Sequence, residues 1–176
     1  MTRRRKGSLG LDRHAALSPV MTTILLIAAA NVAPLAATRL LGRRWAWRLD
    51  AGMAMPDGWP LLGSSKTWRG CAASLLTLLL IARPLETAPS LAARLSLLSM
   101  MGDAAASFLK RRMGVEVHAQ SRWLDPIPEA LLPALVLRHA LGLTRHEVAE
   151  AVFVFAVLEE PWSRLFFRLG LRTRPF

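Results

Sequence analysis

An acidic residue interrupts an apolar stretch at residues 102–112, GDAAASFLKRR, and three consecutive cations close the same stretch. A helix turns by about 100° and rises by about 1.5 Å per residue, so four side chains share one face: Asp103, Ser107, Lys110 and Arg111. Lys110 then lies about 10 Å from Asp103 along the axis, a reach comparable to a triphosphate. The spacing predicts a metal ion held at the acid and phosphate groups held at the cations.

Each of these residues also has a simpler interpretation. Asp103 could form an ion pair with a nearby arginine inside the protein. Three cations at the end of an apolar helix are ordinary determinants of membrane orientation. Arg112 points away from its two neighbours, and snorkelling to the membrane surface explains it without a ligand. The register of the other cations with Asp103, together with the preceding loop, favours phosphate binding.

A second stretch that could bind phosphate is the loop at residues 49–70, LDAGMAMPDGWPLLGSSKTWRG. Its four glycines and two prolines rule out a regular helix through most of its length. The loop ends in Lys66, Thr67 and Arg69, which we expect to bind substrate phosphates. The run GWPLLGSSKT is close to a P-loop, but a P-loop has lysine directly after its second glycine and a strand before it, so we exclude that motif.

Two more acids, Asp125 and Glu129, follow in RWLDPIPEALLP. Carboxylates from different helices that face one another can hold Mg²⁺, whose remaining ligands are usually water and substrate phosphate. We therefore expect Asp103 and Asp125 to be the metal ligands. The alternative for Asp125 is a helix N-cap, since a proline follows it directly. For Glu160 we expect an ion pair with Arg164, four residues later on the same helix.

These candidate residues lie in a chain whose composition is typical of a membrane protein. Hydrophobic residues make up 53% of its 176 positions, and its mean hydropathy is +0.32. The net charge of +11 does not indicate nucleic-acid binding, because aromatic residues are few, tyrosine is absent and the cations lie between apolar runs. Cys71 is the single cysteine, which excludes an internal disulfide and a thiolate metal cluster.

Five apolar segments approach the roughly 20 residues that a helix needs to cross a bilayer: residues 19–41, 71–88, 91–109, 124–141 and 147–169. Neither strand-like alternation nor an internal repeat accompanies them. We therefore predict an all-α membrane protein, a bundle of about five transmembrane helices with cytoplasmic catalytic loops. In this prediction residues 19–176 form a single integral-membrane domain, and residues 1–18 are a basic N-terminal extension for which disorder is one alternative.

The distribution of charge predicts the orientation. With the N-terminus outside, the cytoplasmic loops carry fourteen of the 23 Lys and Arg residues and the outer loops carry nine, as the positive-inside rule prefers. We therefore expect a multi-pass protein of the cell inner membrane whose site faces the cytoplasm. The basic start, MTRRRKG, favours the opposite orientation unless the native chain begins at Met21.

The order of these motifs resembles one family. LGSSKTWRG, followed by GDAAASFLKRR and by an LD pair before the next apolar segment, is similar to the CDP-archaeol synthase family, whose members are integral-membrane, CTP-dependent cytidylyltransferases also found in bacteria. The resemblance covers residues 31–133, and the tail LGLRTRPF also fits the family's basic C-terminus. ANVAP at 30–34 and LDAG at 49–52 correspond to further family positions.

The resemblance implies Mg²⁺-dependent transfer of a cytidylyl group from CTP to an isoprenoid, archaeol-like or other lipid phosphate, with pyrophosphate as the second product. The partners are then CTP, the lipid phosphate and membrane lipids. The catalytic residues that we expect are Asp103, Lys110, Arg111 and Lys66. The substrate-binding residues that we expect are Lys66, Thr67, Arg69, Ser107, Lys110, Arg111 and Arg112.

Two positions depart from the family pattern. Pro126 stands where a glutamine is typical and Ser65 where an asparagine is expected, and each lost polar group removes a hydrogen bond worth roughly 1 kcal/mol. Three other functions stay open at this point: a CTP-dependent lipid kinase, a transporter of an anionic solute, and a membrane scaffold without activity. The reaction products would separate the kinase from the cytidylyltransferase, and nucleotide binding would separate the scaffold from both.

Overall fold

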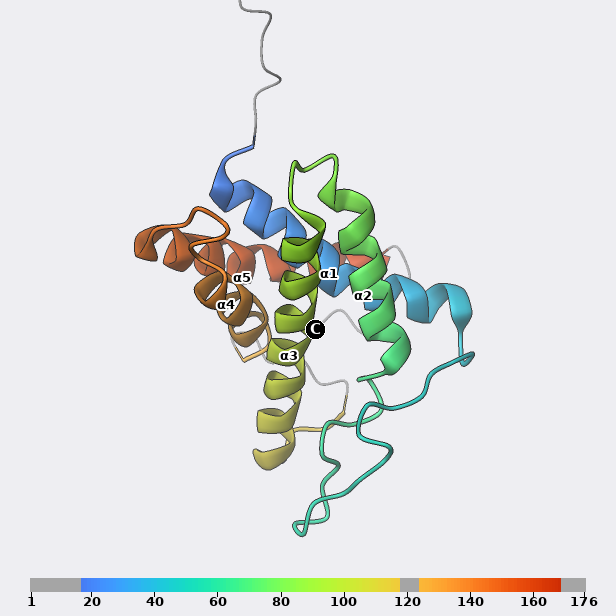
Figure 1. Ribbon diagram of the computed structural model, residues 1–176. Helices are drawn as coiled ribbons and strands as arrows, with labels where there is room; N and C mark the ends of the chain where they lie inside the picture. The colour runs from blue at the N-terminus through green and yellow to red at the C-terminus, as the bar shows by residue number, and fades with distance from the viewer. Residues whose placement is uncertain (1–16, 118–123, 169–176) are drawn as a thin grey trace, which may run out of the picture.

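A computed structural model describes residues 17–117 and 124–168 of the chain. Five helices make up most of this part: α1 (Pro19–Leu41), α2 (Trp68–Ala82), α3 (Pro89–Arg112), α4 (Pro126–Val136) and α5 (Arg145–Arg168). Figure 1 shows α2 and α3 side by side, with α1 crossing them and α4 next to α3, and α5 packs against α1 and α4. The described residues form no β-strand, so the predicted all-α fold is confirmed for them.

Local signals explain where the helices begin and end. Ser18 caps α1, because its Oγ accepts a hydrogen bond from the backbone N–H of Met21 at 3.2 Å. Thr67 caps α2 in the same way, accepting from the N–H of Gly70 at 3.2 Å. Helix α1 ends at Leu41, and its C-cap is Gly42, whose φ of 55° lies in the left-handed region that favours glycine.

The helices pack around one core to which all five contribute. Its largest members are Leu26 and Ile27 of α1, Leu78 of α2, Leu95 of α3 and Phe155 of α5. Several alanines lie between them, and such small residues let helix backbones approach closely. Ser74 of α2 and Ser96 of α3 form a buried hydrogen bond of 2.8 Å, which joins these two helices through polar groups that water does not reach.

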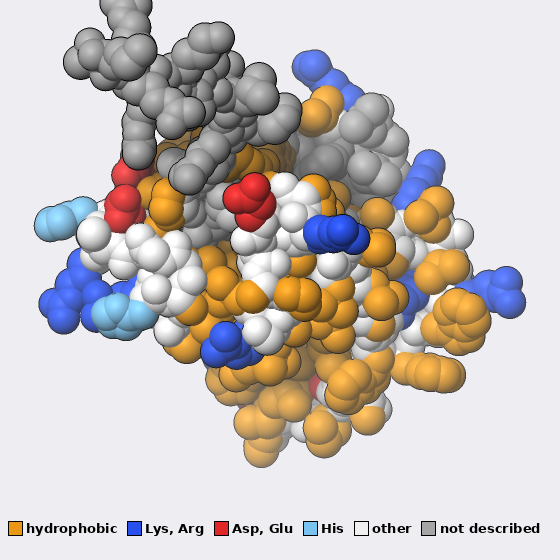
Figure 2. All heavy atoms as spheres, turned by 45° about the horizontal axis from the view of Figure 1, so that its top comes forward, with side chains coloured by type: hydrophobic (Ala, Val, Ile, Leu, Met, Phe, Trp, Pro, Cys, Tyr) orange, Lys and Arg blue, Asp and Glu red, His pale blue; other side chains and the backbone are white. Residues whose placement is uncertain are grey.

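Large apolar side chains also cover the outside of the bundle. The exposed ones include Leu76, Leu80, Leu97, Val136 and Phe153. Figure 2 shows hydrophobic side chains over most of the lower part of one face. A continuous apolar surface of this kind is typical of helices that contact lipid. Judged by length and composition alone, α1 is the one helix of the described residues that is long and apolar enough to cross a membrane. Helices α2 and α4 are apolar but shorter.

Two predicted segments are longer than the helices that form. The end predicted for residues 71–88 is wrong: α2 stops at Ala82, because Pro84 cannot continue the helical hydrogen bonds. The segment 124–141 is wrong as one helix, since α4 has 11 residues and is followed by turns. Leu137 and Leu141, which lie in these turns, pack into the protein interior. Their apolar character therefore reflects burial against protein, not a longer helix.

The other three segments agree with the helices to within a few residues. Helix α1 has the predicted bounds, and α5 begins two residues early, at Arg145. Thr144 and Glu147 explain this start by exchanging hydrogen bonds, a capping box in which each side chain accepts from the other's backbone N–H. Apart from Leu17 and Ser18, the predicted extension at residues 1–18 lies outside the described residues, as does the basic tail at 169–176.

Candidate active site

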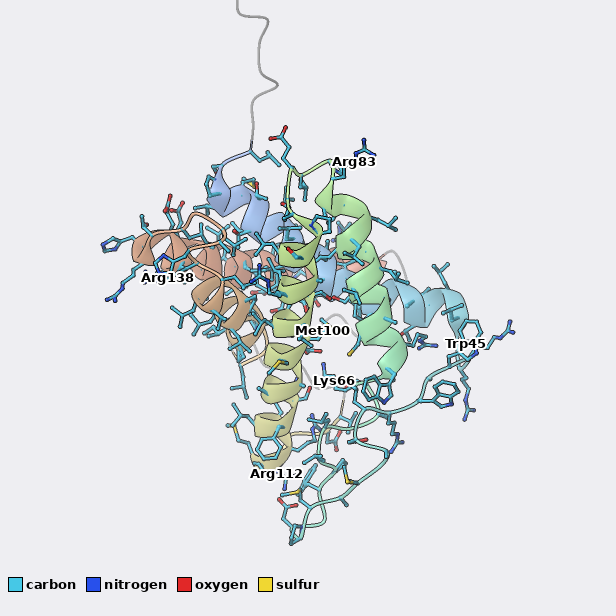
Figure 3. All side chains as sticks on the ribbon, viewed as in Figure 1. Trp45, Lys66, Arg83, Met100, Arg112 and Arg138 are labelled. Atoms are coloured by element: carbon cyan, nitrogen blue, oxygen red, sulfur yellow. The ribbon has the colours of Figure 1, made fainter. Side chains whose placement is uncertain are left out.

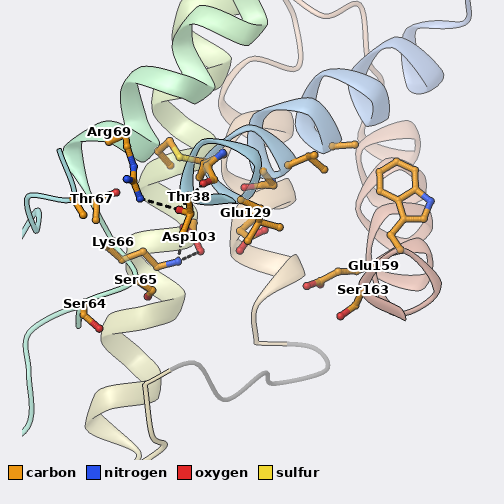
Figure 4. A pocket seen from close by; sticks show the side chains of 18 of the residues that line it. Thr38, Ser64, Ser65, Lys66, Thr67, Arg69, Asp103, Glu129, Glu159 and Ser163 are labelled. Carbon is orange, nitrogen blue, oxygen red and sulfur yellow. Dashed lines mark hydrogen bonds and ion pairs between the residues drawn. The ribbon is translucent and has the colours of Figure 1, made fainter. Parts of the chain in front are cut away.

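The ammonium group of Lys66 contacts both carboxylate oxygens of Asp103 at 2.5 Å (Figure 4). Lys66 ends the long loop between α1 and α2, and Asp103 lies within α3. The carboxyl group of Glu129, from α4, lies next to that of Asp103. The acid predicted to hold a metal thus has an ion pair, but its partner is a lysine and not the arginine considered as the alternative.

A glycine brings these two acids together. A β-carbon on Gly102 would collide with the backbone carbonyl of Pro128 and would lie 2.9 Å from the Cα of Glu129. Only a residue without a side chain lets α3 approach α4 this closely. Gly102 therefore determines that Asp103, the next residue, meets Glu129 of the neighbouring helix.

Lys110 and Asp125 form a second ion pair, with 2.6 Å between the ammonium nitrogen and a carboxylate oxygen. Asp125 occupies the N-cap position of α4, as its alternative interpretation predicted, but its side chain makes no capping hydrogen bond and pairs with Lys110 instead. The carboxylates of Asp103, Glu129 and Asp125 all act electrostatically on Lys66. The two ion pairs therefore belong to one charged cluster between α2, α3 and α4.

Arg111 is buried beside this cluster and retains unused hydrogen-bond donors. Arg111 is 2% exposed, and its Nε and one Nη have no hydrogen-bond partner among the residues that the structure describes. Unpaired buried N–H groups cost free energy, so a bound anion that accepted from them would be stabilised. Ser107, which shares this face of α3, is buried as well.

Arg69 has a structural role that its position in the sequence does not reveal. Its guanidinium group donates to the backbone carbonyls of Gly42 at 2.9 Å and Arg44 at 2.6 Å, and to Oγ1 of Thr38 at 3.1 Å. These acceptors lie at the end of α1, where a helix leaves carbonyl groups without partners. Arg69 thereby attaches the start of α2 to the end of α1.

Arg112 contacts the long loop. It pairs with Asp57 at 2.5 Å, donates to the carbonyl of Pro60 at 2.9 Å, and lies over the ring of Phe108, 5.3 Å from its centre. Figure 3 shows Arg112 at the lower end of α3, below Lys66. These partners hold the tip of the loop against α3.

Asp50 organises the same loop from its interior. Its buried carboxylate accepts hydrogen bonds from the backbone N–H groups of Gly52, Leu62 and Gly63 at 2.9–3.0 Å. Burial alone would raise the pKa of Asp50, but these three donors, with the charge of Arg48, lower it below its usual value. The LDAG motif therefore fixes the fold of the loop that ends in Lys66.

The charge of Lys66 is set by its neighbours in the same way. Burial by itself lowers the pKa of this ammonium group, but the carboxylates of Asp103, Glu129 and Asp125 outweigh burial and raise the pKa above its usual value. Lys66 therefore stays protonated at neutral pH, as a side chain that neutralises phosphate must.

A cavity of about 370 Å³ adjoins the Lys66–Asp103 pair. Its polar lining comprises Asn31, Thr38, Arg43, Ser64, Ser65, Lys66, Thr67, Arg69, Asp103, Glu129, Glu159 and Ser163. Its apolar lining includes Ala28, Val32 and Leu35 of α1 with Phe155 and Trp162 of α5. Figure 4 shows Glu159 and Ser163 on α5, across from Lys66 and Asp103. Such a cavity suits a ligand, or a pair of ligands, that is charged at one end and apolar at the other.

The cavity divides the predicted residues into two groups. Lys66, Thr67, Arg69 and Asp103 line it, whereas Ser107, Lys110, Arg111, Arg112 and Asp125 do not. Glu160 pairs with Arg164 at 2.6 Å, as predicted.

Sequence reasoning left Asn31, Glu129 and Glu159 out of the site. Asn31 donates a hydrogen bond to Ser99 of α3 at 3.2 Å. Polar or ionisable residues inside apolar helices are the signal that could have found all three.

The oxygen donors of the cluster fit a magnesium ion. Carboxylates are ligands that Mg²⁺ prefers, and Asp103 and Glu129 lie next to one another. In residues 17–117 and 124–168, no three His, Cys, Asp or Glu side chains are arranged as a complete metal site. Mg²⁺ commonly uses one or two carboxylates and completes its shell with water and phosphate, so this donor set fits a metal that binds together with a nucleotide.

Known proteins are similar to this chain in sequence and in fold. The chain is 31% identical to CDP-archaeol synthase of Hyperthermus butylicus over 150 residues, covering 81% of this chain and 86% of the relative. It is 32% identical to that of Aeropyrum pernix over 167 residues, covering 89% and 92%. It also matches a solved structure described as an intramembrane enzyme for archaeal membrane lipid biosynthesis, with a TM-score of 0.62 and 30% identity over 78% of this chain and 88% of that one. No protein-family model matches. The curated relatives show that this chain belongs to the CDP-archaeol synthase family.

Proposed function

We propose that this protein is a membrane cytidylyltransferase that joins CMP from CTP to an archaeol-type lipid phosphate and releases pyrophosphate. The observation that carries the proposal is the cavity: the Lys66–Asp103–Glu129 cluster lies at one part of its wall and apolar side chains of α1 and α5 at another. A lipid phosphate and a nucleotide together need both kinds of wall. The curated relatives named CDP-archaeol synthase support the same chemistry.

In this reaction an oxygen of the lipid phosphate attacks the α-phosphorus of CTP. The new P–O bond forms as the bond between the α-phosphorus and the bridging oxygen to the β-phosphorus breaks, and pyrophosphate leaves with that electron pair. Because both reactants are anionic, charge neutralisation and positioning supply most of the rate enhancement. The nucleophile is already an oxyanion, so no serine–histidine pair is required.

The cations of the cluster have the task of holding phosphate. Lys66 lines the cavity and precedes the N-terminus of α2, where the helix dipole also favours anions. Lys110 and Arg111 do not line the cavity but lie beside Asp125 in the same charged cluster. Thr67, Arg69 and Ser107 complete the proposed substrate-binding set. Arg112, predicted from the sequence as a member of this set, would contribute by holding the long loop against α3 through Asp57 and Pro60, and Arg69 also shapes this loop.

Mg²⁺, when bound, would neutralise charge on the triphosphate, held by Asp103 and Asp125 with Glu129 as a further oxygen donor. Lys66 balances the charge of Asp103 in the structure described here. We infer that Lys66 exchanges this carboxylate for nucleotide phosphate when substrate binds, which would leave Asp103 free for the metal.

We also propose that the chain crosses the inner membrane five times, with the cluster on the cytoplasmic side. Charge asymmetry supports this orientation. Helix α4 is too short to cross alone, but the turns after it pack against protein, where non-helical backbone is tolerated at membrane depth. The alternative reaction, CTP-dependent phosphorylation of a lipid, would use similar cations but would move the γ-phosphate.

One experiment separates these reactions. Purified protein in detergent is given Mg²⁺, a panel of isoprenoid and acyl lipid phosphates, and CTP labelled at either the α or the γ position. Label from the α position in the organic phase would support cytidylyl transfer and would identify the acceptor. Label from the γ position alone would make the protein a kinase.

A further inference from the structure

Indole rings are exposed where α1 gives way to the long loop. Trp45 and Trp47 are 56% and 70% exposed, and Leu40 next to them is 82% exposed. Trp68, which is 60% exposed, lies beside this segment, because its backbone N–H donates to the carbonyl of Trp47 at 3.0 Å. Tryptophan exposed next to apolar residues is typical of the boundary between a bilayer and water.

The same segment carries cations that are not neutralised. Arg39, Arg43 and Arg44 are exposed, and their guanidinium groups make no hydrogen bond or ion pair within residues 17–117 and 124–168. The guanidinium group of Arg44 lies 5.5 Å from the centre of the Trp45 ring. Residues 39–48 include no acid. The segment therefore presents positive charge next to exposed indole rings.

Hydrogen bonds from a buried arginine fix the backbone of this segment. Buried Arg69 donates to the carbonyls of Gly42 and Arg44, as described above. Trp45 has a φ of 53°, in the left-handed region that residues with side chains rarely occupy. A backbone held in this way keeps the side chains of the segment directed outward without help from a ligand.

The segment is also one edge of the cavity. Gly42, Arg43 and Ala46 belong to the lining of the cavity next to the Lys66–Asp103 pair. Figure 3 shows Trp45 beyond the end of α1, well separated from Arg83 at the far end of α2. An anion bound at Arg43 would thus stand at the mouth of the cavity.

We propose that residues 39–48 and Trp68 form a binding surface for anionic lipid headgroups, with the headgroup phosphate at Arg43 and Arg44 and the indole rings at the lipid–water boundary. We name it the Trp–Arg surface. A soluble phosphate would need the arginines but not the exposed apolar side chains around them, so the combination favours a lipid. The proposal does not depend on cytidylyl transfer, because it concerns binding in the absence of CTP.

Native mass spectrometry of the full-length protein in detergent tests it, with dioleoyl phosphatidic acid and dioleoyl phosphatidylcholine as the added lipids. The test variant is Arg43→Gln/Arg44→Gln. The matched control is Arg83→Gln/Arg94→Gln, which removes the same charge from exposed arginines outside the surface, in the α2–α3 turn and α3. Thermal unfolding of each variant verifies its fold, and the single variant Arg43→Gln serves if the double variant does not fold.

Each basic residue near an anionic lipid surface contributes roughly a fivefold change in binding, so the test variant, which lacks two, should bind phosphatidic acid about 25-fold more weakly. Phosphatidylcholine binding and the control variant should change by less than about twofold. The proposal is overturned if the wild type shows no preference for phosphatidic acid, or if test and control variants lose it equally. Loss of the preference in excess inorganic phosphate would also overturn it, because the arginines would then bind phosphate from any source.

Discussion

Gly102 of α3 lies against the backbone carbonyl of Pro128 in α4, with no room for a β-carbon between them. Gly102→Ala should therefore push the two helices apart and separate Asp103 from Glu129. Overpacking of this kind costs about 1–3 kcal/mol. We expect a lower Tm in detergent and a loss of activity larger than the loss of folded protein. Ala105→Val, on the exposed side of the same helix, is the control, and an equal effect in both variants would contradict the argument.

The Lys66–Asp103 pair predicts a second stability effect. Lys66→Met leaves the carboxylate of Asp103 without its cation. The two side chains are 17% and 21% exposed, so the cost should lie between the about 1 kcal/mol of a surface pair and the about 3–5 kcal/mol of a fully buried one. The double variant Lys66→Met/Asp103→Asn removes the uncompensated charge as well and should recover most of the lost Tm. If the double variant is as unstable as the sum of both single ones, the pair is not what stabilises this region.

Arg111 and Arg112 are adjacent but differ in their contacts, which makes them a matched pair. Arg111→Gln should raise KM for CTP by about tenfold or more, because its unpaired buried donors are available to an anion. Arg112→Gln breaks a partly exposed pair with Asp57, worth about 1 kcal/mol or less, and should change KM for CTP little. A tenfold rise for Arg112→Gln would instead show that this residue binds substrate itself, as its place in the sequence predicts.

The depressed pKa of Asp50 predicts a pH dependence of stability. A carboxylate whose pKa is lower in the folded state stabilises that state fully above its unfolded pKa, near 4, and ceases to do so as the pH falls through the folded pKa. Asp50→Asn should therefore lower the Tm at pH 7, by an amount set by hydrogen bonds to charge of roughly 1.5–3 kcal/mol each. The difference from the wild type should shrink below pH 4. A constant difference from pH 7 to pH 3 would contradict this assignment.

The sequence predicted the helices where one physical signal dominated. Helix α1 has the predicted bounds because an N-cap, a proline and a glycine surround one uniform apolar run. Helix α4 was predicted too long because Leu137 and Leu141 lie in turns but are apolar, since they pack against the core. Hydropathy does not distinguish such turns from helix.

Within the site, the helical periodicity of α3 correctly predicted that Ser107, Lys110 and Arg111 share a buried face. The contacts of Arg69 and Arg112 could not be predicted. Their acceptors are 25–55 positions away in the chain and are largely backbone carbonyls, which no residue type reveals.

Asp103 is the residue on which the functional account depends most. Asp103→Asn keeps the shape of the side chain but removes its charge, so the variant should insert and fold while losing cytidylyl transfer by at least about a hundredfold. The measurement is incorporation of α-labelled CTP into lipid by wild type and variant, with equal amounts of folded protein verified by size-exclusion chromatography. The account predicts label in lipid with the wild type and almost none with Asp103→Asn. Equal incorporation by both proteins would contradict it and would remove Asp103 from the reaction.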